Sequence, residues 1–388
     1  MTRQDVDLQL GILGLEPLDA AADEQSGFSH PVWTWPQEPA GGGESPDHPL
    51  ARCLDGRFEP GPSAGEAENE VVCDDPDALA VAALATVSDA TPPPVNALSR
   101  ALGDWRLAGG TRDGFAVQVA DWRRQGFARL LCLDPVHLKP ETDHAITFGP
   151  RFLALSEEEL VGLLEGINPW LAQDGMQAVR IGRQTYLLAE SRVDGVGPAS
   201  AAFHRAGAPL ACLLNRNAGV FIDEERSDPV LRQWLTELQM WLYPQPLNDA
   251  RAARGQPIIS SFWPHGLSAL DNALPDPASL PARVLSDSPA VLASTDAGVW
   301  QPDAVGEAVE AIAAGRPVRV LLTEPAWCRL EGDLGGFQQE LARIDDWLAR
   351  LQEQRPDVSV RLDDGRGGRW LPESGLGRLW RQLRRRLS

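Results

Sequence analysis

The sequence is poor in lysine and has no long apolar run, and the second absence excludes a class of protein. Lys139 is the only lysine, so arginine supplies nearly all of the positive charge. No run approaches the 18 apolar residues that a membrane-spanning helix needs. The N-terminus has no basic stretch followed by an apolar one, which is the pattern of a secretory leader. We therefore expect no membrane span and a cytoplasmic location.

The cysteines show no pairing pattern. They are odd in number, scattered along the chain and without a C-x-x-C motif. This usage favours reduced thiols over a disulfide framework or a zinc site. The five are Cys53, Cys73, Cys132, Cys212 and Cys328.

Acidic residues outnumber basic ones by 55 to 35, which gives a formal net charge of −20 at pH 7. Such a charge opposes nonspecific binding to nucleic acid or to an anionic membrane. Hydrophobic residues make up 43% and charged residues 23%, as in ordinary globular proteins. A nucleic-acid partner is therefore disfavoured.

Strand-length apolar segments alternate with helical patterns, which predicts an α/β fold with a mixed sheet flanked by helices. Residues 5–15 alternate and then run apolar, as in a first core strand. Residues 318–322 have the composition of a second buried strand, and residues 337–351 carry apolar side chains at helical spacing.

The length of 388 residues allows more than one domain, and we expect three parts. Residues 1–129 form an N-terminal α/β part, residues 130–280 a middle part, and residues 281–388 a C-terminal part with a basic helical tail. Residues 36–70 are rich in Pro, Gly, Ser and Glu, so we expect a mobile loop there.

The sequence Asp134-Pro135-Val136-His137-Leu138 follows an apolar run. A strand there would carry a carboxylate and an imidazole to its end, with the proline fixing the turn between them. Asp134 and His137 would then bind a hydroxylated ligand or relay a proton. In the alternative, Asp134 caps a turn and His137 is a structural histidine.

Residues 228–266 are predicted to form a helix, a polar elbow, a strand and a glycine turn. Apolar residues recur at helical spacing until Pro244 ends the helix. Asn248 and Arg251 fall in the elbow, and residues 257–263 have the length and β-branched content of a strand.

We hypothesise that polar side chains from these two stretches converge at one rim of the sheet. Arg251 would anchor a small anion through its planar fork, and Asn248 would orient that ligand. His137, paired with Asp134, would tune the site near neutral pH. In the alternative, Arg251 pairs with Asp134 in a buried network and nothing binds. The ligand-binding candidates are Asp134, His137, Asn248, Arg251, Ser261 and His265.

These stretches resemble the RpfE-type regulatory proteins of proteobacteria. The D-P-V-H-L pattern of that family is complete, and parts of N-E-x-Q-M, L-H-x-H-P-V-N-x-x-R and N-S-x-W-x-W-G-G-G are present. Tyr243 and Gln245 stand where the family has histidines, so chemistry that needs both histidines is not expected. The resemblance implies a regulatory role. The other matching residues are Glu237, Gln239, Met240, Pro244, Pro246, Asn248, Arg251, Gly255, Ser261, Trp263 and Gly266.

A more distant resemblance is to archaeal-type, cofactor-independent phosphoglycerate mutases. The elbow is similar to their H-P-V-N-x-x-R-x-x-x-G segment, residues 154–188 to the end of their inserted substrate domain, and residues 318–351 to a strand and helix that carry metal ligands. This resemblance implies an alkaline-phosphatase-like fold in which the middle part is substrate-domain-like. Leu187 and Leu188 replace the arginine and histidine that follow the family's tyrosine.

The metal ligands that the resemblance implies are missing from the expected places. Glu16 stands near the end of the first strand, where the mutases have a metal-binding aspartate, and residues 324–331 contain no histidine. Two-metal phosphoryl transfer needs several carboxylates and imidazoles around a nucleophile. We therefore expect no metal, no cofactor and no mutase activity.

The resulting hypothesis is a cytoplasmic regulatory protein, a degenerate relative of the mutases that binds a small anionic ligand or a protein partner. One alternative is an active mutase-like phosphotransferase. Another is an interaction module that acts through the arginine-rich segment 378–386, which we expect to pack against the acidic body of its own chain.

Overall fold

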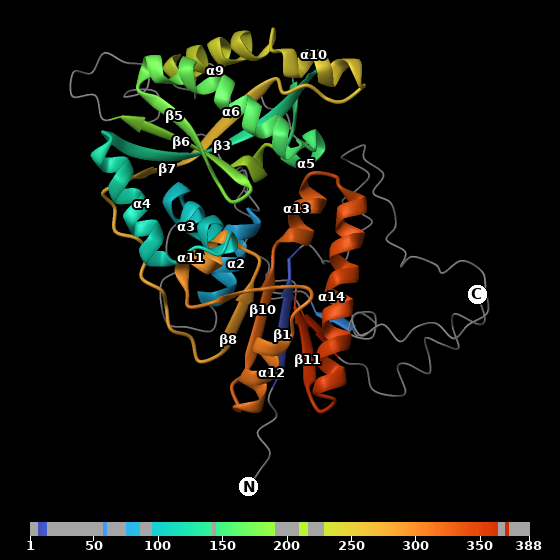
Figure 1. The fold of residues 1–388 in the computed structure, drawn as a ribbon. Coiled ribbons are helices and arrows are strands. Elements are labelled where there is room, and N and C mark those ends of the chain that lie inside the picture. Colours follow the sequence, from blue (N-terminus) through green and yellow to red (C-terminus); the bar gives the residue numbers. More distant parts are fainter. Residues whose placement is uncertain are drawn as a thin grey trace, which may run out of the picture.

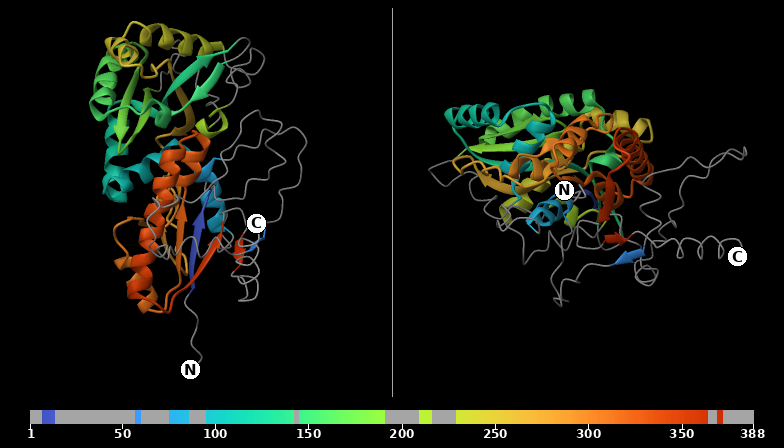
Figure 2. Two further views of the ribbon diagram at one scale, coloured as in Figure 1. Left: turned by 90° about the vertical axis from the view of Figure 1, so that its right-hand side faces the viewer. Right: turned by 90° about the horizontal axis from the view of Figure 1, so that it is seen from below.

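A computed structural model describes most of the chain. The described residues are 7–13, 57–59, 75–85, 95–141, 145–190, 209–215, 229–363 and 369–371. Figures 1 and 2 show two halves stacked on each other, one built on a mainly parallel sheet and one on an antiparallel sheet.

The parallel-sheet half contains seven strands in the order β2-β12-β11-β1-β10-β8-β9. Strand β1 lies between β10 and β11 and runs parallel to both, so the two ends of the chain share one sheet. The strands are β1 (Asp7–Ile12), β2 (Arg57–Glu59), β8 (Arg283–Ser286), β9 (Gly298–Val299), β10 (Val318–Leu322), β11 (Ser359–Asp363) and β12 (Arg369–Leu371).

Helices cover both faces of this sheet, because its central strands are apolar on both sides. Leu8, Leu10 and Ile12 pack with α12 and α14 on one face, whereas Leu13 and Val284 pack with α2 and α11 on the other. The helices of this half are α2 (Pro76–Ala85), α11 (Pro289–Ser294), α12 (Gly306–Ala313), α13 (Glu324–Leu330) and α14 (Leu334–Gln354).

The antiparallel half contains five strands in the order β4-β3-β6-β5, with β7 paired to β3 on its other edge. They are β3 (Phe127–Pro140), β4 (Ala145–Phe148), β5 (Met176–Ile181), β6 (Gln184–Glu190) and β7 (Ser261–Ala269). The tight β5–β6 hairpin turns at Gly182, whose φ of +58° suits glycine.

Helices also cover this sheet on two sides. Residues of α6 and α9 pack on one face, and residues of α3 and α4 pack on the other. The helical segments are α3 (Ala97–Leu107), α4 (Arg112–Arg124), α5 (Pro150–Leu153), α6 (Glu157–Leu171), η2 (Ala172–Asp174), η3 (Leu210–Cys212), α9 (Pro229–Leu242) and α10 (Pro246–Ala253). The expected fold class, α/β with sheets flanked by helices, is confirmed.

Local sequence signals explain several elements. Ser156 and Glu159 form the capping box that begins α6, with each side chain accepting from the other residue's amide. The six apolar residues that indicated a helix over 337–351 are all buried in α14. Of residues 36–70, expected to form a loop, the described residues 57–59 form strand β2 instead.

One expectation about the cysteines is wrong. Cys212 is disulfide-bonded. Cys132 and Cys328 are buried free thiols, as expected. Sequence spacing did not indicate the bond because a disulfide depends on which cysteines meet in space. Within the described part of the chain, no helix is long and apolar enough to cross a membrane.

Candidate functional site

The candidate site is the junction between the two halves, at the carboxyl ends of the parallel strands. Parallel strands present the residues that follow them at one edge of the sheet, where α/β proteins bind ligands. Asp287 follows β8, and Thr323 and Glu324 follow β10. The short helix α13 lies between this edge and the antiparallel half in Figure 1.

Asp287 holds the start of α13. Its Oδ1 accepts from the Thr323 amide at 2.7 Å and from the Thr323 hydroxyl at 3.0 Å, and its Oδ2 accepts from the Glu324 amide at 3.1 Å. Burial raises the pKa of Asp287 to about 7, and the nearby Glu324 carboxylate adds to this shift. Asp287 thus joins two neighbouring strand ends.

Arg151 connects the two halves across the junction. From α5 its guanidinium reaches the carboxylates of Glu324, Glu331 and Asp333, and its amide donates to Glu331 Oε2 at 2.9 Å. Burial raises the pKa of Glu331 to about 7, although the Arg151 backbone and guanidinium oppose the shift. A Cβ at Gly149 would stand 2.5 Å from Glu331 Oε2, so any larger residue there would push the Glu331 carboxylate aside.

A second arginine forms ion pairs with two carboxylates at the start of α2. Arg100, on α3, forms ion pairs with both Asp75 and Asp77. Asp77 Oδ1 also accepts from the Ser288 hydroxyl at 2.6 Å. Burial raises the pKa of Asp77, while the Arg100 charge opposes that shift. This cluster ties α2, α3 and the segment after β8 together.

Asp104 and Tyr186 form a third polar contact, inside the antiparallel half. The Tyr186 hydroxyl, on β6, donates to Asp104 Oδ2, on α3. Burial raises the pKa of Asp104 to about 7, and the bond from Tyr186 opposes the shift. Leu187 and Leu188, which replace the mutase arginine and histidine, are fully buried in the core.

The structure pairs Asp134 with His265 rather than with His137. Asp134 Oδ2 and His265 Nε2 are 2.7 Å apart on neighbouring strands β3 and β7, and both residues are buried. His137 Nδ1 lies 2.9 Å from the Ile258 carbonyl, and its ring lies near those of Phe148 and Phe152. The expected proline turn between Asp134 and His137 is wrong, because β3 continues through both.

The polar elbow is a short helix, α10, whose key side chains bond to the protein itself. Asn248 Nδ2 donates to the Leu242 and Ile259 carbonyls, and its Oδ1 accepts from the Ile259 amide at 2.8 Å. The Ser261 hydroxyl donates to the Phe262 carbonyl at 3.2 Å. Asn248 therefore links the end of α9 to the approach of β7.

The buried Arg251 guanidinium forms hydrogen bonds through all three of its nitrogens. Its Nε donates to the Pro257 carbonyl at 2.8 Å, its Nη1 to Glu159 Oε2 at 2.7 Å, and its Nη2 to the Leu153 carbonyl. The partner carboxylate is thus Glu159, on α6, and not Asp134 as the network alternative supposed. All three nitrogens have protein acceptors.

Sequence reasoning did not select Arg100, Arg151, Asp287 or Glu331 as site residues. One signal for Asp287 was available, since it follows the short strand of residues 283–286, in which Val284 and Leu285 are apolar. The arginines offered no signal, because their partners lie far away along the chain.

No group of three or more potential metal-ligating side chains is present among the described residues. Glu16, which stands where the mutases have a metal-binding aspartate, lies outside the described residues. In the segment 324–331, Glu324 and Glu331 are both held by Arg151.

No protein-family profile and no curated protein matches the sequence. Among solved structures, the PH0037 protein of Pyrococcus horikoshii is 13% identical, covering 93% of this chain and 82% of that one with a TM-score of 0.39. The cofactor-independent phosphoglycerate mutase of Thermoplasma acidophilum is 11% identical, covering 94% of this chain and 88% of that one with a TM-score of 0.31.

Proposed function

We propose that this protein is a cytoplasmic regulatory protein of the RpfE type. In this proposal it is a degenerate relative of the phosphoglycerate mutases that binds a small anionic ligand or a protein partner without phosphoryl transfer. The observation that carries the proposal is that carboxylates at the ligand-binding edge of the parallel sheet are bonded to the protein's own donors.

The hydrogen bonds and ion pairs at this edge balance the negative charge of the carboxylates, as a bound metal ion would. Two-metal catalysis needs carboxylates and imidazoles whose oxygens and nitrogens remain available for the ions. Here Asp287 caps α13, and Glu324 and Glu331 bind Arg151. Arg151 lies between these acidic groups and offsets their negative charge, so in this proposal the junction holds the two halves together.

Four of the six residues that we selected from the sequence form two pairs within this proposal. Asn248 and Arg251 hold the elbow, since their polar atoms already have protein partners. An anion would have to displace Glu159 from Arg251, which costs a buried ion pair. In this proposal, the hydrogen-bonded side chains of Asp134 and His265 are the part of the site that responds to a bound ligand.

The test is an assay of 3-phosphoglycerate interconversion by ³¹P NMR, with Mg²⁺ or Mn²⁺ added, alongside calorimetric titration with 3-phosphoglycerate. We expect no turnover. Turnover that disappears in Glu324→Gln, while Glu310→Gln retains it, would replace this proposal with the enzyme alternative.

One observation favours that alternative, an active phosphotransferase. The Thr323 hydroxyl lies 3.0 Å from Asp287 Oδ1, and a hydroxyl beside a carboxyl whose pKa is about 7 is a nucleophile and base arrangement. If it is catalytic, Thr323→Ser should keep turnover and Thr323→Val should abolish it, with both variants folded by circular dichroism.

A further inference from the structure

Arg319, on β10 of the parallel sheet, is buried without acceptors for its guanidinium. It is 5% exposed, and its Nε and Nη1 have no hydrogen-bond partner within the described part of the chain. Among the described residues it is the only arginine with buried, unbonded side-chain nitrogens. A buried donor without an acceptor has lost its hydration, so a ligand that supplies an acceptor here would be bound favourably.

Two more polar side chains continue from Arg319 across the same face of the sheet. The strand register pairs Gln9 of β1 with Arg319 on one side and with Arg361 of β11 on the other. Figure 1 shows these three strands next to each other. Val284, in register with Arg319, packs with α2 and α11. Since residues in register on parallel strands point to the same face, Arg319, Gln9 and Arg361 form a row on that face.

This row is open at one end. Arg319 is buried, Gln9 is half-buried and Arg361 is exposed. Neighbouring strands are about 4.8 Å apart, so the backbones of Arg319 and Arg361 are roughly 10 Å apart. A small ligand that enters beside Arg361 can therefore reach both guanidinium groups.

The charges of the row favour a small anion. Arg319 and Arg361 carry two positive charges, and Asp363, two residues after Arg361 on β11, carries one negative charge. The Asp363 carboxylate accepts from Gln9 Nε2 at 2.9 Å and does not bond to Arg319 Nε or Nη1. One positive charge is left in excess among these residues, and a guanidinium suits the paired oxygens of a carboxylate or a phosphate.

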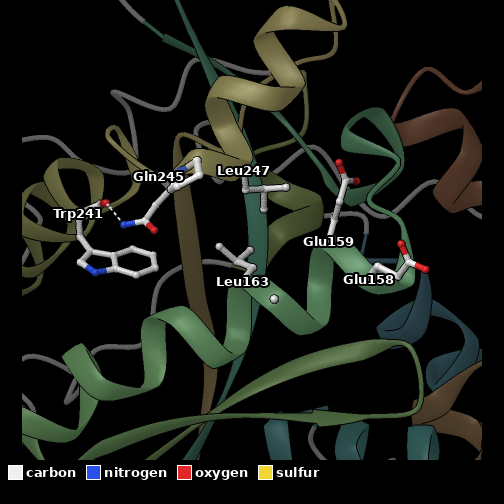
Figure 3. A pocket seen from close by; sticks show the side chains of 8 residues that line it. Glu158, Glu159, Leu163, Trp241, Gln245 and Leu247 are labelled. Carbon is white, nitrogen blue, oxygen red and sulfur yellow. Dashed lines mark hydrogen bonds between the residues drawn. The ribbon is translucent and has the colours of Figure 1, made fainter.

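The pocket in Figure 3 is less suited to an anion. It has a volume of about 260 Å³ and lies between α6 and the junction of α9 with α10. The carboxylates of Glu158 and Glu159 line it, and Gln245 Nε2 already donates to the Trp241 carbonyl at 2.8 Å. Because these carboxylates repel an anion, the sheet face is the better site for one.

We propose that the row of Arg319, Gln9 and Arg361 binds a small oxyanion, either a carboxylate or a phosphate. This inference rests on the proposed function, since it gives a place to the small anionic ligand that Arg251 cannot take without losing Glu159. The anion would supply the acceptors that Arg319 lacks. Failure of this site would leave the turnover result unchanged, so the two proposals are tested separately.

The test is thermal unfolding of the full-length protein with inorganic phosphate or sodium acetate, against sodium chloride at equal ionic strength, followed by calorimetric titration. We expect at least one oxyanion to raise the melting temperature above the chloride reference, because a ligand of the folded state stabilises it. Arg319→Met should weaken that anion at least about tenfold, the size of one hydrogen bond to a charged group. Arg361→Met should weaken it less, because an exposed charge contributes less.

Arg343→Met is the matched control, because it removes the same charge from α14 on the other face of the sheet. Its affinity for the anion should equal that of the wild type. Arg319→Lys keeps the charge without the planar fork, so it should bind with intermediate affinity, and it replaces Arg319→Met if that variant does not fold.

The proposal is overturned if neither phosphate nor acetate raises the melting temperature above the chloride reference. It is also overturned if Arg319→Met, or Arg319→Lys in its place, binds the anion as tightly as the wild type does. A larger shift with phosphate than with acetate would support a phosphate ligand, and the reverse would support a carboxylate.

Discussion

The two halves of the molecule each bury an arginine, and the two arginines differ in how their charge is met. Arg251, in the antiparallel half, is 0% exposed and donates to one carboxylate and two carbonyls. Arg319, on β10 of the parallel sheet, is 5% exposed. Within the described part of the chain, its Nε and Nη1 have no hydrogen-bond partner. Burial lowers the pKa of Arg319, and the Asp363 carboxylate only partly opposes this shift.

The comparison shows that burial alone does not tell whether a charge stabilises a fold. A buried guanidinium loses its hydration, and only acceptors placed around it repay that cost. Arg251 recovers this cost by tying α10 to α6 and α5. Arg319 recovers less of this cost. Replacing Arg319 should therefore raise the free energy of unfolding, whereas replacing Arg251 should lower it.

The largest effect is expected from Arg251→Met, which should destabilise the protein by about 4 kcal/mol because it breaks a buried ion pair and leaves two carbonyls without their donor, while Glu159 keeps only Arg254. Chemical denaturation measures this loss. Arg254→Met is the matched control, since Arg254 binds the same Glu159 but its side chain is 53% exposed. That control should cost less than about 1 kcal/mol. Equal losses would mean that the internal bonds of Arg251 contribute little.

A second effect concerns pH, because burial raises the pKa of Asp104, Asp287 and Glu331 to about 7. The folded protein then binds more protons than the unfolded chain, so the free energy of unfolding should fall as pH rises from about 5 through 7. Asp104→Asn should flatten this dependence by on the order of 3 kcal/mol between pH 5 and 8. Denaturation at each pH measures it, and stability that rises over this window would contradict the assignment.

A third effect concerns the link between the halves. Arg151→Met should destabilise the protein by about 2 kcal/mol at pH 8, where Glu331 is left charged and buried. At pH 5 the loss should shrink, because a protonated Glu331 needs no cation. A loss independent of pH would show that Arg151 acts through packing, and Arg343→Met on the surface of α14 serves as control.

The smallest effect, and the only gain, is expected from Arg319→Met. Replacing an unsatisfied buried charge by an apolar side chain of similar length should be neutral or stabilise by up to about 1 kcal/mol. Thermal and chemical denaturation measure the change. A loss comparable to that of Arg251→Met would reveal an acceptor for Arg319 and end the contrast between the two residues.

Local features of the fold were predictable from the sequence. The capping box of Ser156 and Glu159, the buried stripe of α14 and the strand at residues 318–322 each depend on residues only a few positions apart. Helix and strand periodicity encode such elements directly, because neighbouring side chains decide which face is buried.

The partners of the polar residues were decided only by the tertiary structure. Arg251 and Glu159 are 92 residues apart, and His265 and Asp134 are 131 apart. The register of β3 against β7 pairs His265 with Cys132 and so places it diagonally across from Asp134, two residues further along β3. The contact of α10 with α6 places Glu159 beside Arg251. A hydrogen bond requires two groups within about 3 Å, and no short-range pattern carries that distance. The sequence therefore determined the elements and the residue types available, and the packing of those elements determined which charges are satisfied.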